Sequence, residues 1–243
     1  MKLSIVIPTY NRAILVKDCI RENMNNAQVP ADQIEWVWVD DGSTDGVQEV
    51  MRKMCPDVSI VRNYNLGIEK TVNQGYALAT GDYIFKMDSD IVLQPGWAKE
   101  LIRYLEAIPE TAVIGIPFDY YMKNKWAGET KEINGLEILK ANKIMGFYGF
   151  SRAFFKKVGY LNENMHYYSS SDMYWSDRAM KTGDLIYYIP KVRALHLGHS
   201  NIGSGLDVLD PERGKKNIAR KTKVIITKEQ QKILGTIYYN PYI

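Results

Sequence analysis

Short apolar runs alternate with stretches of helical length over residues 1–115. The runs are rich in β-branched and aromatic residues, as buried strands are, and each ends at polar or turn-forming residues. Strands separated by helices of roughly ten residues favour a parallel sheet covered by helices on both faces. We therefore predict a single-domain α/β fold with a Rossmann-like, mostly parallel central sheet. The expected strands are residues 3–7, 34–39, 58–62 and 83–87, and the expected helices are residues 13–23, 67–79 and a segment ending near 54 that Ser43 or Thr44 would cap.

Three polar clusters follow strands of this expected sheet, at residues 8–12, 40–45 and 88–90. The carboxyl ends of parallel strands share one edge of the sheet, and ligands bind outside that edge. Three clusters in one place indicate a binding site there.

Asp88 and Asp90 end the strand that begins at Tyr83. On an extended chain, residues two apart point to the same side, so the two carboxylates converge. Ionised carboxylates at close range repel unless a cation lies between them, and oxygen ligands suit Mg²⁺ or Mn²⁺. An isolated Asp-x-Asp is more often an exposed turn; the two other clusters favour the metal site.

Composition excludes several classes of protein. The 243 residues are 46% hydrophobic and 24% charged, as in ordinary globular proteins. A net charge of +3 and a pI near 8.6 are too mild to indicate nucleic-acid binding, and no nucleic-acid partner is expected. Cys19 and Cys55 lack the spacing of a zinc site or a disulfide framework. The apolar residues 1–8 are too short for a signal peptide or a membrane span, so we expect a soluble, cytoplasmic protein.

The loop after the first strand contains neither G-x-G-x-x-G nor G-x-x-x-x-G-K-[ST], which argues against a dinucleotide-binding Rossmann domain and against a P-loop. Instead, Tyr10 offers a ring that can stack on a base and Arg12 a cation that can reach phosphate. Asp41 can accept a hydrogen bond from an imide N–H, and a turn with a helix cap is the alternative for residues 40–45.

Five motifs occur in an order that resembles family 2 glycosyltransferases with the GT-A fold, an inverting family that uses nucleotide-sugar donors. The likeness is close over residues 3–115 and resumes from 146 to 183. The motifs are Val6 to Arg12, Val39 to Gly46, Asn65 to Gly67, Asn73 to Gly75 and Ala79 to Asp90.

The resemblance implies a role for each of these motifs. It places the nucleotide on the first loop and Asp41, the pocket wall at Gly67 and Asn73, the ribose near Asp88 and Ser89, and a metal on Asp88 and Asp90. The loop residues implied to bind the nucleotide are Pro8, Thr9, Tyr10 and Arg12.

Asp172 is implied to be the catalytic base, because family members commonly have Glu-Asp at this place. This chain has Ser171 before it, so the preceding acid is missing. The alternative role of Asp172 is an N-cap for a helix expected over residues 173–181. The two roles are compatible, since a helix start keeps a nearby carboxylate ionised.

A histidine near residue 196 can complete the metal shell in related enzymes. We favour His196, which ends a strand-like run, over His199. A hydrogen-bonded histidine at the domain edge is the alternative.

The domain is expected to span residues 1–200, with a nucleotide-sugar-binding half at 1–115 and an acceptor half at 116–200. The tail, residues 201–243, contains glycines followed by six cations between Arg213 and Lys223. It would pack on the site or close over it, form a solvated basic helix, or contact an anionic acceptor or a membrane surface peripherally.

These expectations combine into one function. The chain would transfer a sugar with inversion from a nucleotide-sugar donor to a hydroxyl of a glycan, lipid-linked or protein acceptor, with Mn²⁺ or Mg²⁺. A uridine donor fits Asp41 best, although guanine also presents an N–H. A sugar-nucleotide nucleotidyltransferase is a rival that usually has a Gly-rich basic loop, unlike residues 8–12. A non-catalytic carbohydrate-binding protein on the same fold is the second rival.

Overall fold

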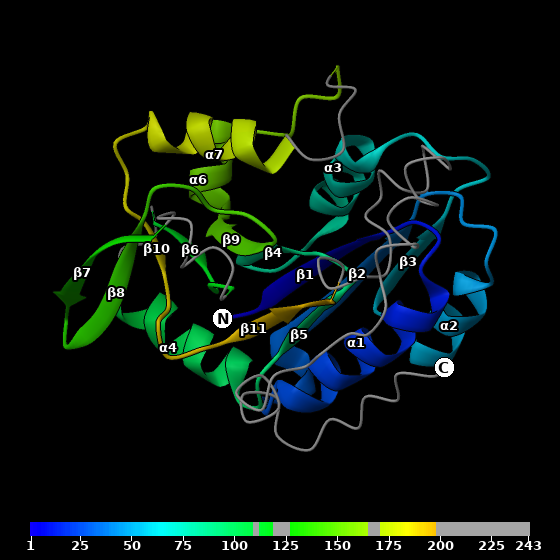
Figure 1. The fold of residues 1–243 in the computed structure, drawn as a ribbon, viewed down its shortest axis with the longest axis horizontal. Helices are drawn as coiled ribbons and strands as arrows, with labels where there is room; N and C mark the ends of the chain where they lie inside the picture. Colours follow the sequence, from blue (N-terminus) through cyan, green and yellow to red (C-terminus); the bar gives the residue numbers. More distant parts are fainter. Residues whose placement is uncertain (109–111, 119–126, 165–170, 198–243) are drawn as a thin grey trace, which may run out of the picture.

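The computed structural model describes residues 1–108, 112–118, 127–164 and 171–197. In the described chain, a nine-stranded sheet forms the centre of the molecule (Figure 1). The spatial order of its strands is β3-β2-β1-β4-β9-β6-β10-β8-β7. Their bounds are β1 Leu3–Thr9, β2 Ile34–Asp40, β3 Val58–Val61, β4 Tyr83–Met87, β6 Val113–Gly115, β7 Ala127–Ile133, β8 Leu136–Ala141, β9 Phe147–Ser151 and β10 Ile186–Tyr188.

The first four strands pair in parallel, with β1 in the middle between β2 and β4. Strand β9 lies antiparallel between β4 and β6, and β10 runs parallel to β6. Most strands therefore share one direction, and the predicted α/β fold with its central sheet is confirmed. The register places Thr9 beside Asp40, so the polar residues that follow β1 and β2 lie at the same edge.

Helices cover both faces of the sheet (Figure 1). Side chains alternate along β1: Leu3, Ile5 and Ile7 pack with α1, α2 and α4, whereas Val6 packs with α3. The helices α6 and α7 lie on the α3 side, and they contribute Phe154 and Trp175, respectively, to that core. The helix bounds are α1 Ala13–Asn26, α2 Val47–Met54, α3 Ile68–Leu78, α4 Trp97–Ala107, α6 Arg152–Val158 and α7 Ser171–Met180.

A two-stranded ribbon of β5 (Ile91–Leu93) and β11 (Ala194–His196) lies beside the main sheet. It is antiparallel and places His196 opposite Ile91. The Asn23 amide on α1 anchors the ribbon, since it donates to the Ile91 carbonyl and accepts from the Leu93 N–H, both at 2.8 Å. This pairing brings residues more than 100 apart in sequence to one place.

Three local expectations were wrong. Helix α2 begins at Val47 and not at a Ser43 or Thr44 cap, because Gly46 before it adopts a left-handed φ of 88°. The third strand ends at Val61, one residue earlier than expected. Helix α7 already includes Asp172, which lies in its first turn and not at an N-cap before residue 173.

The predicted domain boundaries at 115 and 200 remain predictions, and the tail from 201 to 243, like His199, lies outside the described residues. Among the residues that are described, no helix is long and apolar enough to cross a membrane.

Candidate functional site

The polar clusters that follow β1, β2 and β4 meet at the carboxyl edge of the parallel strands. After β4, the chain turns, because the Ile91 N–H bonds back to the Asp88 carbonyl at 3.3 Å. Asp88 and Asp90 are therefore brought together by a turn and not by an extended chain, as the sequence argument assumed. Ser89, between them, is buried in that turn.

Asp88, Asp90 and His196 offer ligand atoms that all lie within 4.8 Å of one another. The ribbon fixes this grouping: the Leu197 N–H donates to the Asp90 carbonyl at 2.9 Å, and His196 Nε2 lies 3.0 Å from Asp90 Oδ1. Two carboxylate oxygens and an imidazole nitrogen are suitable ligands for Mn²⁺, so this donor set fits a divalent cation.

Arg12, Lys86 and His196 lie next to the two carboxylates of the candidate metal site and oppose their negative charge. Burial disfavours the charged form of Asp90, but His196 and Arg12 outweigh it and lower the pKa of Asp90 well below its usual value. The charge of Asp90 in turn raises the pKa of His196, against the effect of burial. Burial raises the pKa of Asp88, although Lys86 opposes the shift.

Lys86 joins the Asp88 turn to Asp172. Along β4, Lys86 shares the face of Ile84, which packs toward α3, α6 and α7. Its Nζ lies 2.7 Å from Asp88 Oδ1 and 2.5 Å from Asp172 Oδ2. Burial alone would lower the pKa of Lys86, but the two carboxylates raise it well above its usual value. The lysine therefore stays charged at neutral pH.

The Asp172 carboxylate is fixed from three sides by groups outside its own helix. Besides Lys86, the Tyr148 hydroxyl donates to Oδ1 at 3.1 Å and the Gly146 N–H to Oδ2 at 3.3 Å. The Gly146 carbonyl accepts from the Asp88 N–H at 3.2 Å. Asp172 and the Asp88 turn thus share one backbone support at Gly146.

A second buried carboxylate, Glu69, lies in the first turn of α3 beside Asp172. Its side chain is 5% exposed, and burial raises its pKa although it accepts a hydrogen bond from Ser171. Lys86 and Glu69 were missed by the sequence analysis. A lysine within the otherwise apolar strand β4 is the sequence signal that could have identified Lys86. The sequence gives no comparable signal for Glu69.

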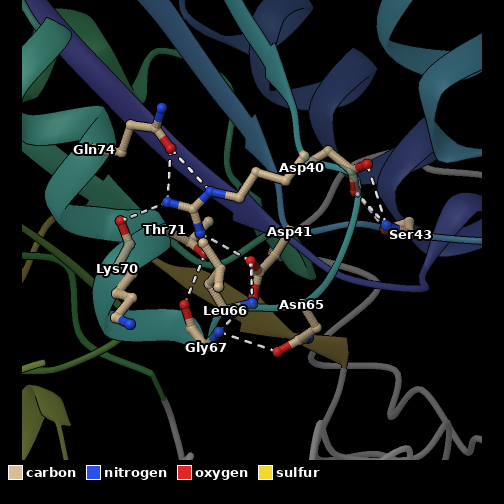
Figure 2. Close-up of polar contacts among 10 residues, drawn as sticks. Asp40, Asp41, Ser43, Asn65, Leu66, Gly67, Lys70, Thr71 and Gln74 are labelled. Carbon is tan, nitrogen blue, oxygen red and sulfur yellow. Dashed lines mark hydrogen bonds and ion pairs between the residues drawn. The ribbon is translucent and has the colours of Figure 1, made fainter. Parts of the chain in front are cut away.

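Asp41 lies just beyond β2, only 2% exposed, and its carboxylate already has three donors. Arg62 Nη1 lies 2.8 Å and the Leu66 N–H 2.9 Å from Oδ1, while the Gly67 N–H lies 2.9 Å from Oδ2 (Figure 2). Neighbouring Asp40 is used differently, because it accepts from Ser43 and Gln48. Asp40 therefore supports the turn, and Asp41 faces the 65–67 segment.

Other residues of the expected nucleotide site have structural contacts. Thr9 is buried and its hydroxyl oxygen accepts from Trp38 Nε1 at 2.8 Å. The Asn73 amide holds the segment after α6. Its nitrogen donates to the Leu161 carbonyl at 2.9 Å, and its oxygen accepts from the Leu161 N–H at 2.8 Å. The Asn73 amide also donates to Glu163 Oε1 at 2.9 Å. Pro8 lies within β1 opposite Val39, so it is not part of the loop, whereas Tyr10 and Arg12 follow the end of the strand.

Comparisons with known proteins agree with this geometry. The sequence model of Glycosyl transferase family 2 matches residues 4–175. The chain belongs to this family. It is 32% identical over 126 residues to an uncharacterised glycosyltransferase of Mycoplasma pneumoniae and 34% identical over 120 residues to one of Nostoc. These matches cover 49% and 48% of the chain, but only 41% and 35% of the two relatives.

Solved structures share the fold of this family member. TarS 1-349 of S. aureus in complex with UDP aligns with a TM-score of 0.63 at 19% identity, over 79% of this chain and 60% of TarS. The mannosyltransferase PcManGT of Pyrobaculum calidifontis, in complex with GDP-Man and Mn²⁺, aligns with a TM-score of 0.64 at 19% identity, over 91% of this chain and 65% of PcManGT. At such identities the likeness establishes the GT-A fold.

Proposed function

We propose that this protein transfers a sugar from a nucleotide-sugar donor, with a uridine base preferred, to a hydroxyl acceptor with inversion. The observation that carries the proposal is the grouping of Asp88, Asp90 and His196 next to the Lys86–Asp172 pair. Solved neighbours support the donor class, since they hold UDP, UDP-GlcNAc or GDP-Man. The acceptor, a glycan, lipid-linked or protein hydroxyl, remains part of the proposal.

Asp172 is the proposed base. The acceptor oxygen forms a bond to the anomeric carbon, the bond from that carbon to the diphosphate oxygen breaks, and the acceptor proton moves to Asp172. One displacement of this kind inverts the anomeric centre. Lys86, Tyr148 and Gly146 hold the carboxylate in place while leaving it room to accept one more hydrogen.

Asp88, Asp90 and His196 would hold Mn²⁺ or Mg²⁺ at the diphosphate. When bound, the ion supplies positive charge that stabilises the leaving diphosphate. Arg12, which contacts Asp90, places a permanent cation at the same edge of the sheet. Mn²⁺ accompanies the ligands of PcManGT and of GalNAc-T7, which supports this choice of ion.

Donor hydrolysis tests the proposal without knowledge of the acceptor. The purified protein is incubated with Mn²⁺ and a panel of UDP-, GDP- and dTDP-sugars, and release of the nucleoside diphosphate is measured. We expect slow hydrolysis of one UDP-sugar that is lost on chelation and in Asp88→Asn. Glu132→Asn, which changes an exposed acid on β7, is the control. Release from no donor, with UDP binding absent as well, would refute the proposal.

A further inference from the structure

Arg62, the residue after β3, uses its whole guanidinium group within the protein. Nε donates to Gln74 Oε1 at 2.9 Å, and Nη2 donates to the same oxygen at 2.6 Å and to the Lys70 carbonyl at 2.9 Å. Nη1 donates to Asp41 Oδ1 at 2.8 Å and to Thr71 Oγ1 at 2.9 Å. A guanidinium has five N–H donors, and all five have an acceptor here. Arg62 is the unlabelled residue whose dashed lines lead to Gln74, Lys70, Thr71 and Asp41 in Figure 2.

These contacts close into a ring through the start of α3. The Thr71 hydroxyl donates to the Gly67 carbonyl at 2.8 Å, and the Gly67 N–H donates to Asp41 Oδ2 at 2.9 Å. Arg62 bridges the other two corners, Asp41 and Thr71. Gly67 has a φ of 98°, a conformation that most other residues rarely adopt. The ring therefore fixes Asp41 relative to the 65–67 segment and the helix.

The ring leaves Asp41 one direction from which to accept a further hydrogen. A carboxylate has about four acceptor positions, two on each oxygen. Oδ1 is filled by Arg62 and the Leu66 N–H, and Oδ2 receives the Gly67 N–H. Within the described residues, one position on Oδ2 remains. Because the Arg62 charge balances Asp41, this acceptor stays buried without an unpaired ion.

We propose that Arg62 is a positioning residue for base recognition, which holds Asp41 so that Oδ2 accepts only from a base with an N–H at its pairing edge. The inference rests on the proposed function. Arg62 has no donor left for the nucleotide, so it acts through Asp41. A uracil or guanine ring presents such an N–H, whereas the adenine ring presents an acceptor nitrogen there. The hydrogen-bonded ring through Arg62 and Asp41 therefore determines which base is preferred, and not only how tightly a nucleotide binds.

Arg152 provides a matched control at the other end of α3. Its Nε donates to the Gly81 carbonyl at 2.8 Å and its Nη2 contacts the Ala79 carbonyl. Like Arg62, it ties the α3 segment to the sheet, but within the described part of the chain its hydrogen bonds go to these two carbonyls and not to Asp41. Loss of either arginine should lower stability, and only loss of Arg62 should change the choice of base.

The experiment measures UDP, GDP and ADP affinities by titration calorimetry with Mn²⁺ present, together with a thermal melt. The variants are Arg62→Met, Arg62→Lys and Arg152→Met. We expect the ratio of UDP to ADP affinity to fall at least about tenfold in Arg62→Met, on the order of 1.4 kcal/mol. Lysine, which lacks the planar fork, should restore little of the ratio. Arg152→Met should keep the ratio while its melting temperature falls.

Three results would overturn the inference. They are an unchanged ratio in folded Arg62→Met, an equal loss of ratio in Arg152→Met, and a parent protein without base preference. The last would also remove Asp41 from base recognition, while donor hydrolysis reports separately on the proposed function. If the Arg62 variants do not fold, Gln74→Met removes the acceptor of two Arg62 bonds, so that the guanidinium, and through it Asp41, is no longer held in one position. A lower ratio in that variant supports the inference, and an unchanged ratio overturns it.

Discussion

Charge balance at the level of single residues explains how four carboxylates lie close together at one end of the sheet. Lys86 bridges Asp88 and Asp172, and Arg12 pairs with Asp90. Each pair is mostly buried, where an uncompensated charge would cost several kcal/mol. Among the described residues, the fourth acid, Glu69, forms no such ion pair, and burial raises its pKa. Lys86 and Arg12 thus place a positive charge beside the proposed base and beside both carboxylates of the candidate metal site.

Replacement of Asp172 tests the proposed base. Asp172→Asn keeps the size of the side chain and much of its hydrogen bonding, but it cannot take a proton. Transfer should fall by roughly 10²–10⁴, the usual contribution of a positioned general base. Donor affinity should change little, because Asp172 is assigned to the acceptor. The measurement is transfer rate and donor affinity on the same preparation.

Asp177→Asn is the control, since Asp177 lies on the same helix as Asp172 but pairs with Lys143 instead of Lys86. It should retain transfer near the parent rate. Near-normal transfer by Asp172→Asn would exclude Asp172 as the base and direct attention to Glu163 or Glu69. A melt close to the parent in both variants shows that the loss of transfer in Asp172→Asn does not come from unfolding.

Glu35 gives a pH-dependent stability that can be measured alone. Burial of this side chain is opposed by hydrogen bonds from Ser4 and Thr80, which together lower its pKa below the ordinary 4.5. A lowered pKa stabilises the folded state above pH 4.5, and that stability is lost as pH falls through the folded-state pKa. Glu35→Gln should cost about 1–3 kcal/mol at pH 7.

Urea unfolding of parent and Glu35→Gln between pH 7 and pH 3 checks this. The difference in unfolding free energy should be constant above pH 4.5 and should shrink below it. The exposed Glu132→Gln should show no such change. A difference that grows on acidification would contradict the assigned direction of the shift.

At the level of elements, local patterns predicted local structure. The apolar runs at 3–7 and 34–39 form β1 and β2. Continuous β-branched and aromatic runs are typical of strands that a covered parallel sheet buries on both faces. The β5–β11 ribbon was not predicted. Each of its strands has three residues, too few for an alternating hydrophobic pattern, and the two strands lie about 100 residues apart in the sequence. The β7–β8 hairpin had a signal that was overlooked: Asn134 and Gly135 both have positive φ, as a two-residue hairpin turn requires.

The packing of α3 on β1 depends on Gly75. A Cβ at this position would lie 2.2 Å from Val6 Cγ1, a side chain fixed within the central strand. Alanine favours a helix by about 1 kcal/mol over glycine, but overpacking should outweigh this with a net loss of about 1–3 kcal/mol. Chemical denaturation of Gly75→Ala measures the balance.

Val6→Ala provides the matching partner, because it removes the methyl groups that a Cβ at residue 75 would meet. The double variant should lose less stability than the sum of the two single losses. Strict additivity would mean that the helix shifts without contacting Val6, and that α3 is not held at this point.

At the level of the whole molecule, the sequence predicted which edge of the sheet carries the site but not the contacts that build it. Asp41, Asp88 and Asp90 could be chosen as candidate site residues because they follow strands whose carboxyl ends meet. Arg62 and Lys86 were missed because their importance lies in partners that only the folded chain supplies. His196 was chosen over His199 for ending a strand, and the structure places it beside Asp90.

The same assembly predicts linkage between metal and nucleotide. Asp88, Asp90 and a diphosphate all carry negative charge, so their approach is favourable only when a divalent cation lies between them. UDP affinity should fall at least about tenfold, on the order of 1.4 kcal/mol, when Mn²⁺ is removed by a chelator. By reciprocity, UDP should tighten Mn²⁺ binding by the same factor. Titration calorimetry in both orders of addition measures the two factors.

Thermal melts extend the test to the folded state as a whole. Mn²⁺ and UDP together should raise the melting temperature by more than the sum of their separate effects, because ligands that bind the native state stabilise it by mass action. His196→Gln should weaken this synergy while it leaves UDP affinity without Mn²⁺ unchanged. Equal UDP affinity with and without Mn²⁺ would contradict the metal site. Arg12 and Lys86 would then be the cations that receive the diphosphate, and Asp88 and Asp90 would serve to hold them.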